Sequence, residues 1–281
     1  MPITEDYRVC AVKIGATTIG QITDQEVTED LRLLLARDSA AVYNRAASAD
    51  LLDSRVRFTT EAVKTALNAV PLTGTPLATL TPAVVYFAKY TDGGGIAANG
   101  CVTFTYAKGV ALLRSISAAE GRLASVSIEI IGVSPDGTTH PAEKATGVAV
   151  PTVETEEMFT VGSPAGIVSL SIETGIAEHL RRDGAETFYT LVAYDLIQPT
   201  VRYSLAAMAV LGVVDTIDEV TLIDCLQGAA RGTSPITIAL NQSIGAARRV
   251  GGGPNSTDYE ATPTWDGTNA PLVITGITPP P

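Results

Sequence analysis

The sequence predicts a mainly β protein, a β-sandwich or partial barrel with one short helix in each of two tandem units. Three observations support this. Short stretches of alternating apolar and polar residues, bounded by Gly and Pro, recur along the 281 residues. A block of 27 residues, 37–63, matches 182–208 without a gap. Finally, 46% of the residues are hydrophobic and only 17% are charged, which suggests a surface partly covered by partners.

The repeated block has eight identical pairs among its 27 positions, at a constant separation of 145 residues. Chance would give about two or three in a chain this rich in alanine. Shorter matches follow at separations of 134 and 130 residues: Val102-Thr103 with Ile236-Thr237, and Asp136-Gly137-Thr138 with Asp266-Gly267-Thr268. The shrinking separation indicates loop deletions in the second copy. We therefore expect two units of one fold, 1–150 and 151–281.

The first elements of the unit are short strands. Val9–Ile14 and Ile19–Gln25 alternate around a glycine turn. Glu29–Asn44 contains leucines spaced for a helix, but its counterpart Ile176–Tyr189 is interrupted by Gly184 and is rich in Thr and aromatic residues. A long loop or splayed hairpin fits both copies better than a helix.

A strand that leads into a helix follows in each unit. Ser54–Thr59 alternates as a strand, and Thr60–Val70 carries one apolar stripe that Pro71 ends. In the second unit, Val201–Ser204 precedes Leu205–Val214, which is apolar on all sides and predicts a buried helix.

The rest of each unit is predicted to form hairpin strands. Val84–Tyr90 and Cys101–Tyr106 form a hairpin with two different faces, and Val220–Cys225 and Pro235–Leu240 repeat it with a shorter connection. Ala124–Val133 adds a strand that a Ser-Pro-Asp-Gly turn closes. Each unit is expected to hold about six strands and one helix.

Charge and cysteine content exclude several classes of protein. The net charge is −11 and no Lys or Arg cluster occurs, which argues against specific binding of nucleic acid. An acidic wall would instead let DNA pass without holding it.

Cys10, Cys101 and Cys225 lack metal-site spacing and are expected to be free thiols. The N-terminus does not resemble a signal peptide, and the longest apolar run, 205–214, is too short to cross a bilayer, so no membrane segment is expected.

Catalytic patterns are sparse. His140 and His179 are the only histidines and do not match between the units. No nucleophile elbow, phosphate loop or dinucleotide-binding glycine pattern occurs, and the glycine runs 93–95 and 251–253 read as loops. We expect no enzyme activity, no cofactor and no metal site.

The candidate interface residues are the charged positions that the two units share: Arg37, Asp38, Arg57, Arg182, Asp183 and Arg202. A repeated Arg that reaches a repeated Asp of the neighbouring unit would set the register of a unit-to-unit interface through bidentate geometry. Ordinary solvated or fold-stabilising charges are the alternative interpretation.

The order of these elements resembles a known family. A glycine-turned strand pair (14–20), a long loop with Arg37-Asp38, a strand entering a short helix (56–61) and an alternating hairpin are similar to the tail tube proteins of tailed bacteriophages. The resemblance implies a β-sandwich unit with a flanking helix, six of which form a ring with a continuous inner barrel. Rings stack into a conduit for the genome, and members with two fused units form trimers.

The resemblance also implies a role and a location. The chain would be a structural protein of the virion tail, assembled in the host cytoplasm, with further copies of itself and other tail proteins as partners. DNA would pass through the lumen without specific binding. Two alternatives stay open: a baseplate hub or distal tail adaptor that makes one ring, and a carbohydrate-binding virion decoration protein. Against the second, aromatic residues make up only 5% of the chain, with Trp265 the single tryptophan. A catalytic hydrolase on a β-sandwich ranks last.

Overall fold

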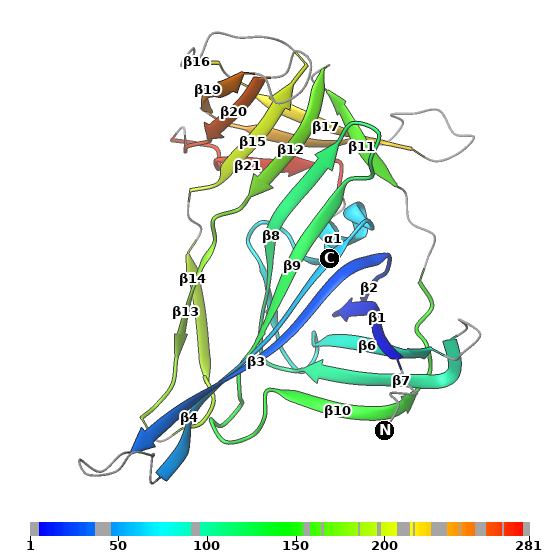
Figure 1. Ribbon diagram of the computed structural model, residues 1–281, viewed down its shortest axis with the longest axis vertical. Helices are drawn as coiled ribbons and strands as arrows, with labels where there is room; N and C mark the ends of the chain where they lie inside the picture. Colours follow the sequence, from blue (N-terminus) through cyan, green and yellow to red (C-terminus); the bar gives the residue numbers. More distant parts are fainter. Residues whose placement is uncertain are drawn as a thin grey trace.

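The structure is a computed structural model that describes residues 6–36, 46–90, 96–153, 158–163, 166–184, 186–195, 198–206, 214–215, 217–225, 235–241, 243–250, 257–265 and 267–277. Within these ranges it contains twenty-one strands, arranged in four antiparallel sheets, and one helix (Figure 1). The predicted fold class, mainly β with sandwich character, is confirmed.

A ten-stranded sheet runs through both halves of the chain. Its strands, in spatial order from one end, are β3 (Ile22–Ala36), β4 (Ala46–Thr60), β9 (Ser125–Gly132), β8 (Gly109–Ala119), β12 (Ile167–Glu173), β15 (Thr200–Leu205), β20 (Thr257–Thr262), β19 (Ile244–Val250) and β16 (Val214–Asp215), with β5 (Thr75–Leu77) also paired to β8. Strands β8 and β12 join the first half of the chain to the second.

Two smaller sheets lie apart from each other along the long axis (Figure 1). The five-stranded sheet has the order β10 (Ala142–Val148), β7 (Ile96–Tyr106), β6 (Ala83–Tyr90), β1 (Asp6–Ile14) and β2 (Thr17–Ile19). The four-stranded sheet has the order β21 (Leu272–Thr275), β18 (Ile236–Leu240), β17 (Glu219–Asp224) and β11 (Phe159–Ser163). Strands β13 (Ala177–Arg181) and β14 (Leu191–Asp195) form a separate ribbon.

The strand orders of the two halves correspond. The order β10-β7-β6-β1 in the five-stranded sheet matches, strand for strand, the order β21-β18-β17-β11 in the four-stranded sheet. Within the ten-stranded sheet, the order β3-β4-β9-β8 matches β12-β15-β20-β19 in the same way. Two register shifts also correspond. Between β3 and β4 the pairing slips at 22–24, and between β12 and β15 at 167–169. Between β8 and β9 it slips at 113–115, and between β19 and β20 at 247–249. Strands of the two halves that match in chain order therefore occupy matching places in their sheets.

The helix α1 (Val63–Ala69) confirms the helix predicted within residues 60–70, after the strand 54–59. Seven residues are too few for a helix to be stable alone, so packing must hold it. Thr60 fixes its start: the Thr60 hydroxyl donates to the Gly20 carbonyl (2.6 Å) and accepts from the Ala62 N–H (3.0 Å). The helix predicted at 205–214 lies mostly outside the described residues, and the two residues at its bounds belong to strands β15 and β16.

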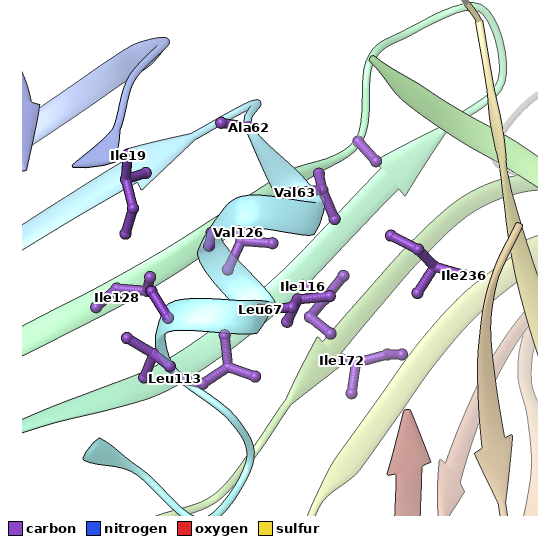
Figure 2. Close-up of a cluster of buried hydrophobic side chains, with 14 of the residues drawn as sticks. Ile19, Ala62, Val63, Leu67, Leu113, Ile116, Val126, Ile128, Ile172 and Ile236 are labelled. Carbon is purple, nitrogen blue, oxygen red and sulfur yellow. The ribbon is translucent and has the colours of Figure 1, made fainter. Parts of the chain in front are cut away.

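A single buried cluster connects the two halves. Val63 and Leu67 of α1 pack on the ten-stranded sheet, where Leu113 and Ile116 contact the helix from β8 (Figure 2). The same cluster contains residues of the second half, among them Ile172. The hydrophobic core is therefore continuous across the predicted unit boundary.

Two further predictions concern the strands of the first unit. Of the interpretations open for Glu29–Asn44, the hairpin is correct for the described part, because β3 extends to Ala36 and β4 begins at Ala46. The expectation of about six strands per unit is wrong, since the described residues within 1–150 form ten strands. The strands that the prediction missed are short, as β2 and β5 are, or lack clear alternation, as β8 does.

Candidate assembly interface

The junction between the halves is an antiparallel pairing of β8 with β12. Five residue pairs form it, from Ser169 opposite Ala119 to Glu173 opposite Ser115. Within it Ile172 lies opposite Ile116, and both side chains are fully buried. The two halves thus share a backbone ladder as well as a core.

The ends of the ten-stranded sheet are open in the described part of the chain. At one end β3 pairs with β4 on one side, and no described strand pairs with its other side. Near the other end β16 pairs with β19 at Gly245 and Ala246 only. By strand order β3 corresponds to β12, and β19 corresponds to β8. The end strand β3 is therefore the counterpart of β12, whereas β19, the counterpart of β8, already has β16 beside it.

An exposed valine marks the open strand β3. The side chain of Val27 is 44% exposed although its cross-strand neighbour Val56 is buried. Ile172, which holds the corresponding position on β12, is 0% exposed because β8 covers it. Val27 thus extends a buried apolar row to an uncovered sheet edge.

Arg57 and Arg202 occupy corresponding places on the sheet face that points away from α1. Arg57 lies opposite Glu129 on β9, with 3.6 Å between Nη2 and Oε1. Arg202 lies opposite Glu260 on β20, with 3.7 Å between Nε and Oε2, and its Nη1 is 2.9 Å from Glu173. Both arginines are about half exposed, so each pair contributes about 0–1 kcal/mol. Each arginine pairs with acids of its own half.

Arg182 and Asp183 lie in the turn that follows β13. Arg182 donates from Nη1 to the Glu186 carbonyl (2.8 Å), and the Asp183 N–H donates to the Glu186 carboxylate (2.9 Å), which shapes the turn of the β13–β14 ribbon. Arg37 and Asp38 lie outside the described residues. An Arg–Asp pair between neighbouring units therefore stays a prediction.

Ion pairs between the halves involve residues outside the six candidate interface positions. We call Arg55, Arg114, Glu129 and Glu178 the inter-half charge cluster. Arg114 donates to Glu129 (2.6 Å) and to Glu178 (2.7 Å), and Arg55 donates to the other oxygen of Glu178 (2.6 Å). Partial burial opposes ionisation of Glu178, but these hydrogen bonds outweigh it and lower its pKa to about 2. Glu178 on β13 is thereby fixed to strands β4 and β8 of the first half.

Apolar contacts fix the same ribbon. Ile176, Leu180 and Tyr194 pack on Val110 and Leu112, on the face of β8 opposite to α1. The Tyr194 hydroxyl also hydrogen-bonds to the Thr73 carbonyl. The β13–β14 ribbon of the second half therefore covers part of the first half's sheet.

The two histidines lie apart from each other in the structure. His140 pairs with Glu29 (3.0 Å) and His179 with Asp195 (3.1 Å), each at a separate place. No cluster of three metal-ligating side chains occurs among the described residues.

Burial, with Cys101 as neighbour, raises the pKa of the Cys10 thiol to about 11, which keeps it protonated. A hollow of about 390 Å³ between the α1–β5 loop and β21 is lined by Leu72, Ile274 and other residues without titratable groups.

No protein-family model matches the chain, and no curated protein matches its sequence. Among the described residues, no helix is long and apolar enough to cross a membrane.

Proposed function

We propose that the chain is the structural subunit of a bacteriophage tail tube. Three chains close into a ring of six units, and rings stack into a conduit through which the genome passes. The partners are other copies of the chain and further tail proteins. The count of six units rests on the resemblance to tail tube proteins with two fused units.

The observation that carries this proposal is the composition of the ten-stranded sheet. The sheet already joins its two halves through β8 and β12, and β3, the counterpart of β12, lies at one end of it with no described strand on its outer side. A strand of another chain added beside β3 would repeat this kind of junction. Such head-to-tail contacts form a ring when the rotation closes, and closure removes exposed sheet edges.

The sheet face away from α1 suits a channel wall. It carries serine hydroxyls, such as Ser117 hydrogen-bonded to Ser125 (2.9 Å). Its half-exposed arginines Arg57 and Arg202 each have an acidic partner. Neutralised arginines offer little to a phosphate backbone, so DNA can pass without being retained.

Assembly of the purified full-length chain tests the proposal. We expect light scattering to detect a species of three 29.2 kDa chains, and negative-stain microscopy to show rings at low and tubes at high concentration. A monomer at all concentrations would reject the proposal. Rings that never stack would favour the single-ring adaptor instead.

A further inference from the structure

Asn99 on β7 combines an exposed position with an unusual backbone conformation. Its φ angle is +52°, and among the described residues only Gln21 and Asn99 have a positive φ without being glycine. Asparagine tolerates this left-handed region better than most other residues do. The next residue is Gly100, and this is the one place in the sequence where Asn precedes Gly.

The strand pairing leaves Asn99 outside the regular ladder. β7 pairs with β6 at Ile96 opposite Tyr90 and at Cys101 opposite Ala88. Between these two pairs β7 contains residues 97–100, whereas β6 contains a single residue, so β7 forms a bulge here. The pairing of β7 with β10 starts at Cys101 and runs the other way along β7. Residues 97–100 therefore have no cross-strand partner in β6 or β10, and this end of β7 lies at the periphery of the molecule (Figure 1).

The same bulge requires glycine at position 100. A Cβ atom at this position would lie 2.8 Å from both the Cβ and the carbonyl oxygen of Ala97, which is too close unless the backbone shifts. Because Gly100 has no Cβ, its backbone nitrogen can be approached more closely than that of any other residue type. The fold therefore places an exposed asparagine directly before an unhindered backbone nitrogen.

We propose that Asn99 is a site of spontaneous deamidation in the folded protein, with water as the co-reactant. The backbone nitrogen of Gly100 gives its proton to hydroxide and attacks Cγ of Asn99. A C–N bond forms, the bond from Cγ to Nδ2 breaks, and the side-chain nitrogen leaves as ammonia. Water then opens the cyclic imide at one of its two carbonyls. The product is aspartate or isoaspartate, and either adds one negative charge to the chain.

Local opening of the bulge is sufficient for this reaction. The attack requires the Asn99 side chain and the following peptide to rotate towards each other, which strand hydrogen bonds would resist. At the bulge no pair with β6 or β10 has to break, and departure from the positive φ relieves backbone strain. Isoaspartate lengthens the main chain by one carbon atom, which a bulge accommodates better than a paired strand does. We therefore expect the modified protein to stay folded.

Two other sites in the chain serve as internal controls. Asn269 is also exposed but precedes Ala270, whose Cβ hinders the attacking nitrogen. Asp136 precedes Gly137, but hydrogen bonds, above all from the Thr139 N–H (2.7 Å), hold the pKa of its carboxyl below the usual range. The carboxylate therefore stays ionised, and an ionised carboxylate resists attack by nitrogen. Asn269 tests the need for glycine, and Asp136 tests the need for a side chain that is not held in place.

Peptide mapping by mass spectrometry tests the proposal. Wild-type protein and Asn99→Ser would be incubated at 37 °C and at pH 6.5, 7.5 and 8.5, in water enriched in the heavy oxygen isotope, which distinguishes deamidation during incubation from deamidation during digestion. Asn99 should deamidate at least tenfold faster than Asn269, and faster as the pH rises, because hydroxide removes the proton from the attacking nitrogen. Isoaspartyl methyltransferase should label the peptide that contains position 99 in the wild type and not in Asn99→Ser.

The folded state is tested by a parallel incubation in 6 M urea. The rate at Asn99 in native buffer should lie within tenfold of the rate in urea, with an unchanged circular dichroism spectrum throughout. A native rate more than tenfold below the rate in urea would overturn the proposal, because the fold would then protect Asn99. Deamidation of Asn99 no faster than that of Asn269, or isoaspartate that accumulates equally at position 136, would overturn it too. Such a failure would leave the tail tube proposal intact, since that proposal assigns no role to Asn99.

Discussion

Glu178 illustrates how a single side chain can fix one half of the chain to the other. It accepts hydrogen bonds from Arg55 and Arg114, which come from two strands of the first half. Arg114 also donates to the carbonyl of Ile176 (2.6 Å), two residues before Glu178. Removing one partner of a partly buried ion pair leaves the others without compensation, so this position should matter more than the exposed pairs on the same face.

Substitution of Glu178 by Gln should therefore destabilise the protein in a pH-dependent way. The pKa of Glu178 falls from an ordinary 4.5 to about 2 on folding, so its ionised form stabilises the folded state. This contribution is complete above about pH 4.5 and is lost as the pH falls towards 2. Urea unfolding of wild type and Glu178→Gln should give different free energies at pH 7 that converge in acid.

The control for this prediction is Glu173→Gln, which breaks an ion pair in which both side chains are about half exposed. Its effect should be at most about 1 kcal/mol. A Glu178→Gln effect that is no larger than the control, or that stays constant from pH 7 to pH 2.5, would contradict the role given to Glu178.

At the scale of elements, α1 depends on tertiary packing. Leu67 is fully buried, whereas Leu80 in the turn before β6 is 93% exposed. Leu67→Ala should lower the free energy of unfolding by about 2–5 kcal/mol, because a cavity opens between α1 and the sheet. Leu80→Ala should change it by less than about 0.5 kcal/mol. Similar losses in the two variants, measured by urea unfolding at one oligomeric state, would mean that α1 does not pack as described.

Elements whose signal is local could be predicted from the sequence. The apolar stripe before Pro71 predicts α1, and the alternation in 101–106 predicts β7, because each pattern depends on near neighbours. Strand β8 could not be recognised in this way. Its residues 110–113 are all buried, two against the core and two against the β13–β14 ribbon, so the alternation disappears. The four consecutive buried residues are understood only from the structure, which shows that both faces of β8 are covered.

The candidate interface was predictable to a smaller extent. The repeated block identified Arg57 and Arg202, which do hold corresponding places. The inter-half charge cluster joins residues 64 and 123 positions apart, and the position that matches Glu178 in the first unit is Leu33. A comparison of the two units identifies only the residues that both units share. It therefore misses a contact whose residues occur in one unit alone. Strand partners across the junction likewise depend on the fold and not on local sequence.

At the scale of the whole molecule, the two halves depend on each other. The core cluster includes side chains from both, the β8–β12 ladder joins their sheets, and the inter-half charge cluster connects the β13–β14 ribbon to the first half. The covalent connection between β10 and β11 is therefore a minor part of what holds them together.

Cutting that connection tests the mutual dependence. With a protease site replacing residues 154–157, between β10 and β11, cleavage should yield two fragments that still elute together on gel filtration, because buried strand pairing and packing join them. The uncut variant gives the reference elution volume, and separation of the fragments in 6 M urea verifies complete cleavage. Fragments that separate in native buffer while each keeps its β-type circular dichroism spectrum would identify two autonomous domains. The cut chain should also form the same rings as the uncut chain, since a junction that works within one chain without its covalent link is also suited to work between chains.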